Sequence, residues 1–143
     1  MLAGNEVTAM IAVTDLARAR KFYEDVLGLK PASPDDSEVQ VYQSGNAKIA
    51  IYVSEFAGTN RATAITWEVP DLEAEVKDLK AKGVRFEHYD MPNTTRKADI
   101  HVSGPIQNSW FKDPDGNIIA VMKQVDVTQA RQSDRAASAG SNR

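Results

Sequence analysis

The chain of 143 residues contains no cysteine and only two histidines, His88 and His101. Without cysteine it can form no disulfide framework, no thiolate zinc site, no iron–sulfur cluster and no thiol nucleophile. Two imidazoles are also too few for a histidine-rich metal centre. Because a chain without cysteine suits a reducing compartment, we expect a cytoplasmic protein.

The sequence also lacks a long apolar run and an excess of basic residues. No apolar stretch approaches the roughly 18 residues that a membrane-spanning helix needs. The opening MLAGNEVTAM shows no basic segment followed by an apolar one, so we expect no signal peptide. Acidic residues outnumber basic residues by 20 to 17, whereas nucleic-acid binders usually carry a basic excess. We therefore expect neither a membrane nor a nucleic acid as partner.

The remaining composition is that of an ordinary globular protein. Hydrophobic residues make up 42% of the chain and charged residues 26%, and the length suits a single domain. Residues 125–143 are rich in Gln, Ser, Ala, Arg, Asp and Asn, which predicts a polar C-terminal tail. A short helix over 128–139 that packs on a partner subunit is a weaker alternative.

Hydrophobic periodicity predicts two helices. Apolar residues recur at helical spacing over 16–27, after Asp15 as N-cap and before Gly28, and again over 72–81, after Asp71 and before Gly83. β-Forming segments bounded by turn residues predict strands at 6–13, 29–32, 39–43, 48–53, 62–69, 84–89, 107–112 and 117–123. A longer polar loop is expected over 90–104, and Asp115-Gly116 predicts a tight hairpin before the last strand.

The chain repeats itself at an offset of 56 residues. The segment Val13-Thr14-Asp15-Leu16 matches Val69-Pro70-Asp71-Leu72, and each half contains a strand, a helix and then three strands. Two unrelated strand–helix junctions could share an Asp cap by coincidence, but the common order of elements favours a duplicated unit. We assign residues 1–57 to a first module and residues 58–124 to a second.

Two motifs resemble the vicinal oxygen chelate superfamily, which includes glyoxalases, bleomycin-resistance proteins and extradiol dioxygenases. The opening motif comprises 13–16 and the FYEDVLGL of 22–29, and the closing motif is the WFKDPDGN of 110–117. The resemblance implies an α+β fold of two βαβββ modules, whose mixed sheet curls into a cup. It also implies homodimers, because each module leaves a sheet edge open.

In the metalloenzymes of this superfamily, the first and last strands of each module each project a metal ligand into the cup. The matching positions here are Thr8, Ala50, Ala64 and Ala120. Alanine has no donor atom, and a single hydroxyl cannot replace the three or so protein ligands of a catalytic metal. We therefore expect no metal and no other cofactor, and a cup that is open and apolar.

Strand alternation predicts which other side chains line the cup. Met10 shares a face with Thr8, Tyr52 with Ala50, and Met122 with Ala120. Together these residues would form a mostly apolar small-molecule site. The alternative is that the same side chains fill the cup as packed core.

Trp67 is predicted to face the helices, whereas Trp110 could contact either a ligand or the core. His101 and Tyr89 are weak candidates for acid–base catalysis, and an ordinary strand or loop role is the stronger interpretation. The leading hypothesis is a metal-free protein that binds a partly apolar small molecule in the sheet cup. The alternative is a glyoxalase-like lyase, isomerase or dioxygenase with non-standard catalytic residues.

Overall fold

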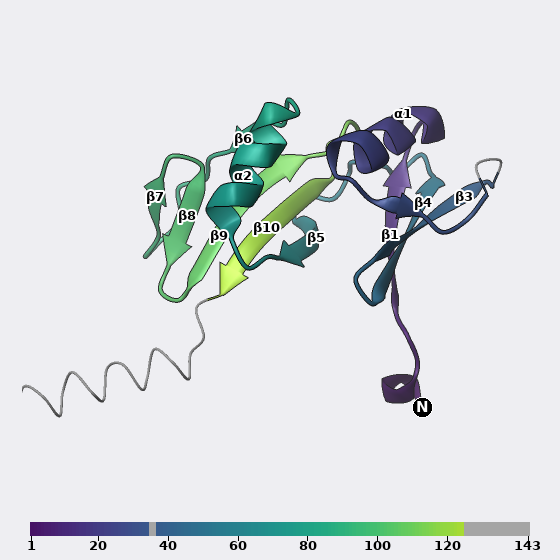
Figure 1. Cartoon of the computed structure of the whole chain (residues 1–143), viewed down its shortest axis with the longest axis horizontal. Coiled ribbons are helices and arrows are strands. Elements are labelled where there is room, and N and C mark those ends of the chain that lie inside the picture. The colour runs from purple at the N-terminus through teal and green to yellow at the C-terminus, as the bar shows by residue number, and fades with distance from the viewer. Residues whose placement is uncertain (35–36, 125–143) are drawn as a thin grey trace, which may run out of the picture.

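The computed structural model describes residues 1–34 and 37–124, which form an α+β fold with two mixed sheets (Figure 1). In chain order the first half contains η1 (Leu2–Gly4), β1 (Thr8–Val13), α1 (Leu16–Arg20), the π-helical stretch η2 (Lys21–Val26), β2 (Lys30–Pro31), β3 (Val39–Ser44) and β4 (Ala47–Val53). The second half contains β5 (Thr63–Glu68), α2 (Leu72–Ala81), β6 (Phe86–Glu87), β7 (Thr95–Lys97), β8 (Ile100–Ser103), β9 (Ile106–Lys112) and β10 (Ile118–Gln124). The expected tail and its alternative helix lie outside the described residues.

The first sheet has the strand order β1-β4-β3-β2. β1 runs parallel to β4, and β3 is antiparallel to both β4 and β2. Ile11, Val13, Ile49 and Ile51 alternate onto the face that packs against α1 and η2, where all four are buried. In each sheet, no helix of residues 1–34 and 37–124 covers the opposite face, and we call it the helix-free face of that sheet (Figure 1).

The second sheet repeats this arrangement, with β5 parallel to β10, β10 antiparallel to β9, and β6 along the far edge of β9. It then departs from the sequence-based expectation, because the predicted loop over 90–104 contains the β7–β8 hairpin. β8 also pairs with β9, so the hairpin widens the sheet to the order β5-β10-β9-β8-β7. β6 is only two residues long, since the edge of β9 is divided between β6 and β8.

Within the first predicted helix, Leu16–Arg20 are α-helical and Lys21–Val26 are π-helical. Asp15 caps it, accepting a hydrogen bond from the Arg18 backbone N–H. From Lys21 onward the turns widen, and the N–H of Leu27 donates to the carbonyl of Phe22, five residues back. The wider turn allows the adjacent Phe22 and Tyr23 to pack inward together, with Tyr23 fully buried. α2 follows the prediction, and Asp71 caps it in the same way.

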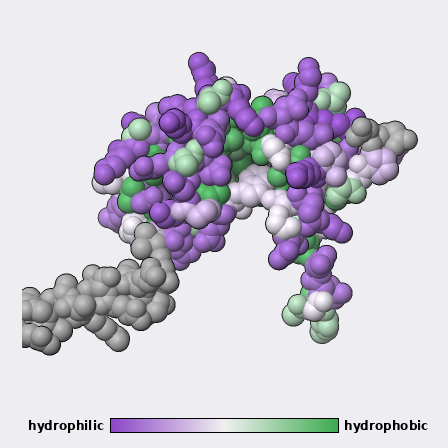
Figure 2. Space-filling model, viewed as in Figure 1, coloured by the Kyte–Doolittle hydropathy of each residue, from purple (hydrophilic) through white to green (hydrophobic). Residues whose placement is uncertain are grey.

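A single apolar cluster joins the helices and sheets of the two halves. α1 and α2 lie on the same side of the molecule (Figure 1), and Phe22 meets Phe111 of β9 with ring centroids 6.3 Å apart. Trp67 packs against this cluster as predicted, and its indole N–H donates to Ser44 of the first sheet over 2.8 Å. Figure 2 shows the surface arched, with a hollow between the two halves.

The hairpin turn of the closing motif forms a buried polar joint between the halves. The Tyr23 hydroxyl donates to the Asp113 carboxylate over 2.8 Å, and both side chains are buried. The amide of Asn117 donates to the same carboxylate and to the Ala12 carbonyl of β1, each over 2.8 Å. Burial and the neighbouring Asp113 charge raise the pKa of Tyr23, so its hydroxyl keeps the proton that it donates.

Asp115 extends this joint to the surface. Its carboxylate accepts from the Thr14 hydroxyl over 2.6 Å and pairs with the Arg18 guanidinium over 2.9 Å. The residues of the turn motif therefore hold the second sheet against the strand–helix junction of the first half.

Among the described residues, no helix is both long and apolar enough to cross a membrane.

We predict that Tyr23→Phe lowers the free energy of unfolding by about 1–3 kcal/mol, because it removes one buried hydrogen bond to a carboxylate. Urea unfolding monitored by circular dichroism measures the change. Phe22→Leu is the control for altered packing without a lost hydrogen bond. A Tyr23→Phe variant as stable as the parent would contradict the role of this joint.

Candidate functional site

The helix-free face of the first sheet carries four of the predicted ligand-binding residues. The β1–β4 register pairs Met10 with Ala50, and Thr8 and Tyr52 lie two residues away on the same face. Met10 is 58% exposed and Thr8 is exposed, whereas Ala50 is buried and Tyr52 is half-buried. This face is therefore largely apolar and only partly covered.

The other four predicted residues gather on the helix-free face of the second sheet. Ala120 pairs with Trp110 of β9 and with Thr66 of β5, and Met122 follows on the same face of β10. Ala64 falls where the β5–β10 register shifts by one residue, and it is exposed. Ala120 is buried and Trp110 and Met122 are half-buried.

Trp110 lies opposite the core, which answers the question that the sequence left open. Its neighbour Phe111 takes the buried side of β9. The Trp110 indole N–H donates to the Thr63 hydroxyl over 3.1 Å, and its ring meets Tyr89 edge-on with centroids 5.5 Å apart. These two contacts hold the indole ring in place, and the rest of the half-buried ring borders open surface.

The donor set at the four metal-ligand positions does not fit a metal ion. Thr8 supplies one hydroxyl, and Ala50, Ala64 and Ala120 supply no donor atom. In residues 1–34 and 37–124, no group of three or more His, Asp or Glu side chains is placed to hold a metal.

His101, the first catalytic candidate, is buried with both ring nitrogens engaged. Nε2 accepts a hydrogen bond from the Tyr89 backbone N–H over 2.9 Å, and Nδ1 lies 3.3 Å from the Asn108 carbonyl. These partners assign the proton to Nδ1 and leave no ring nitrogen for a substrate. Burial lowers the pKa of His101, so the ring stays neutral near pH 7. His101 therefore has a structural role, because its ring links β8 to the Asn108 carbonyl of β9 and to the Tyr89 backbone N–H in the segment after β6.

Tyr89, the second candidate, is half-buried between His101 and Trp110. Burial, followed by the nearby Glu87 charge, raises the pKa of Tyr89. Its hydroxyl therefore remains protonated at neutral pH and can donate a hydrogen bond to a ligand, but it is a poor base.

A cavity of about 910 Å³ adjoins Trp110 on this face. Trp110 and Tyr89 belong to its wall, together with Ile118 from β10. The described lining includes Trp110 but none of the other seven residues predicted to bind a ligand. The cavity therefore lies at the end of the second sheet where the turn at Gly116 joins β9 to β10.

Sequence reasoning missed the two cations of this cavity, Arg61 and Lys112. Arg61 comes from the segment that connects the halves, which offers no periodic signal. Gly58 lets that segment pass close to the β9–β10 turn. It has a φ of +71°, and a Cβ there would collide with the Asp115 carbonyl oxygen. Lys112 was identifiable, since it shares a strand face with Trp110.

We predict that His101 makes folding stability depend on pH below about 6.5. Its pKa is near 6.5 when unfolded and lower when folded, so the unfolded chain binds the proton first. The contribution is fully present above pH 6.5 and declines as the pH falls toward the folded-state pKa.

Urea unfolding at pH 7.5, 6.5 and 5.5 measures this effect. His101→Phe is expected to be less stable than the parent at pH 7.5, and to lose less stability on acidification. His88→Gln, which removes the other imidazole together with its contact to Asp99, is the comparison variant. An unchanged pH slope in His101→Phe would show that another group is responsible.

The comparisons with known proteins agree with this architecture. An antibiotic-binding protein from a Streptomyces species aligns with a TM-score of 0.62 at 17% identity, over 87% of this chain and 98% of that one. A putative glyoxalase family protein from Bacillus anthracis aligns with a TM-score of 0.59 at 18% identity, over 84% of this chain and 94% of that one. An integron cassette protein from the mobile metagenome of V. cholerae aligns with a TM-score of 0.57 at 24% identity, over 83% and 94%.

These structural likenesses support the fold, while a family model matches the sequence itself. The match extends over residues 7–121, from β1 into β10, and includes both motifs noted in the sequence. The chain therefore belongs to the Glyoxalase/Bleomycin resistance protein/Dioxygenase superfamily.

Proposed function

We propose that the protein binds a flat, partly apolar small molecule on the helix-free face of the second sheet, without a metal. The observation that carries this proposal is the cavity of about 910 Å³ beside Trp110. Its volume is within the range of small-molecule sites, and a fixed indole provides a surface on which a planar ligand can stack.

The charges around this cavity favour an anionic group on the ligand. Arg61 and Lys112 contribute two cations, and Asp90 is the one carboxylate in the described lining. The Lys112 ammonium is 4.0 Å from Glu87, a distance at which an exposed pair contributes little. A planar acid could place its ring against Trp110 and its carboxylate near these cations.

Binding fits the site better than catalysis. A lyase, isomerase or dioxygenase needs a proton acceptor or a set of metal ligands. His101 has both ring nitrogens engaged, Tyr89 holds its proton, and the four family ligand positions offer a single hydroxyl. Asp90, the remaining carboxylate of the cavity wall, is exposed, and neither histidine is in the described lining to act with it. The structural likeness to an antibiotic-binding protein supports the same choice.

We further propose a homodimer, in which a second copy covers the helix-free face of the first sheet. That face includes Met10 and Val39, which are 58% and 40% exposed, and Tyr52 lies between them. β1 and β5 each form the edge of their sheet, with no further strand paired to them in the described part of the chain. A cytoplasmic location remains part of the proposal, supported by the lack of cysteine.

We predict that 2-naphthoate quenches the fluorescence of Trp110 and raises the melting temperature. Trp67→Phe serves as the parent protein, because it leaves Trp110 as the sole tryptophan. In this background Arg61→Gln and Lys112→Gln should each weaken binding by about threefold to tenfold. Lys30→Gln, on the first sheet, is the control for the loss of a positive charge.

Uncharged 2-naphthol tests the role of the cations. It should bind more weakly than 2-naphthoate to the parent and should be insensitive to Arg61→Gln. Quenching that is equal for both compounds and unaffected by either substitution would argue against this site.

We predict that Met10→Asp shifts the protein toward monomer, because it places a charge on the apolar face proposed to be covered. Light scattering after size-exclusion chromatography measures the mass, and Lys21→Asp on the surface of η2 is the control. A parent protein that is monomeric at 100 μM or above would refute the dimer.

A further inference from the structure

A pocket of about 230 Å³ lies between the two halves, on the side of the sheets that carries the helices. The first half contributes Leu27 and Leu29, which follow η2, and Ser44 at the end of β3. The second half contributes Trp67, Val69, Glu75, Leu79, Phe111 and Val121. We call this space the inter-half pocket, and hydrophobic surface is visible between the two halves in Figure 2.

The wall of the inter-half pocket is almost wholly apolar. Apart from Ser44 and Glu75, every described lining residue is hydrophobic. Trp67 is half-buried, and its indole N–H donates to the Ser44 hydroxyl over 2.8 Å, so the ring is held in place. An apolar cavity of about 150 Å³ is large enough to take up benzene, so this pocket can admit a single ring.

Glu75 supplies the one charged group in the described lining of this pocket. It is exposed whereas Phe111 and Val121 are buried, so its carboxylate marks the mouth of the pocket. No basic group of the described residues lies within 4.0 Å of this carboxylate. A ligand that enters the pocket would therefore meet apolar side chains inside and an available negative charge at the opening.

The pocket continues between α2 and η2 as a second space of about 320 Å³, which shares Leu27 and Glu75 with it. Asp78 adds a second carboxylate here, again with no basic group of the described residues within 4.0 Å. Lys82 is the one cation in the described lining, and its ammonium donates to the Asp25 carbonyl over 3.4 Å. The opening therefore carries an excess of negative charge.

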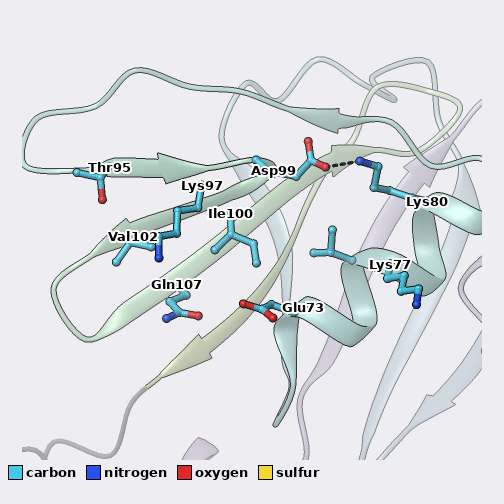
Figure 3. A pocket seen from close by; sticks show the side chains of 11 residues that line it. Glu73, Lys77, Lys80, Thr95, Lys97, Asp99, Ile100, Val102 and Gln107 are labelled. Carbon is cyan, nitrogen blue, oxygen red and sulfur yellow. Dashed lines mark hydrogen bonds and ion pairs between the residues drawn. The ribbon is translucent and has the colours of Figure 1, made fainter.

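The nearby lysine of α2 is engaged on the other flank of the helix. Glu73 and Lys80 project toward the β7–β8 hairpin, where the Lys80 ammonium donates to Asp99 over 2.7 Å (Figure 3). Because an α-helix turns by about 100° per residue, Glu75 and Asp78 lie on the opposite flank of α2. Lys80 is therefore held away from the carboxylate at the mouth of the pocket.

We propose that the inter-half pocket binds a small primary amine that carries a single aromatic ring. The ring would lie against Trp67 and the aliphatic wall, and the ammonium would lie at the mouth beside Glu75. Because such a ligand contacts both halves, its binding would stabilise their association. The proposal does not depend on a ligand beside Trp110, because the two sites share no described lining residue.

The first experiment titrates the full chain, labelled with ¹⁵N, with 2-phenylethylamine while the two indole N–H signals are recorded. We expect a saturable shift of the Trp67 signal and an unchanged Trp110 signal, and Trp110→Phe assigns the two. 3-Phenylpropionate has the ring with the opposite charge and ethylamine has the charge without the ring, so each should bind at least about fivefold more weakly. A shift that centres on Trp110 or does not saturate, or equal binding of 3-phenylpropionate, would refute the site.

The second experiment removes the carboxylate at the mouth. Glu75→Gln should weaken the binding of 2-phenylethylamine by about fivefold to tenfold, with a larger effect at low salt than at high salt. Glu73→Gln removes the same charge from the opposite flank of α2 and should leave the affinity unchanged (Figure 3). Equal affinity in the two variants would overturn the proposal.

Discussion

The Asp113 carboxylate holds the two halves of the molecule together. It is buried at the hairpin turn, where it accepts hydrogen bonds from Tyr23 of the first half and from Asn117 of its own turn. Burying a carboxylate costs free energy unless its oxygens accept hydrogen bonds. The turn is therefore most stable in the position where the donors of both Tyr23 and Asn117 reach the Asp113 carboxylate. That position sets how the second sheet meets the first, and it brings Gly58 against the turn. The cavity beside Trp110 is bounded by this same turn and segment.

The period of two along the strands was enough to predict which residues share a face. Met10 with Ala50, and Ala120 with Met122, lie as alternation requires, because successive side chains on a regular strand point to opposite faces. The face of Trp110 could not be predicted, since it depends on where β9 begins and on its register with β10. The cavity could not be predicted either, because Arg61 reaches it through a connecting segment that only the tertiary structure positions.

The two local errors in the prediction have different physical origins. Residues 90–104 were expected to be a loop because they contain Pro92, Asn93 and several polar residues, yet β7 is an exposed edge strand that needs no apolar pattern. The π-helical stretch was hidden because its apolar spacing resembles that of an α-helix, and the structure shows both Phe22 and Tyr23 packed in the core along this stretch. In each case a tertiary contact, rather than local preference, decided the backbone.

The parallel pairing of β1 with β4 has a consequence for the order in which the protein is assembled during synthesis. All four strands of the first sheet precede residue 54, so that sheet can close before the second half leaves the ribosome. The partner of the Tyr23 hydroxyl, Asp113, follows 90 residues later in the chain, and the partner of the Ala12 carbonyl, Asn117, follows 105 residues later. The joint between the halves is therefore completed by the last hairpin to be synthesised, and a chain that stops before residue 113 lacks it.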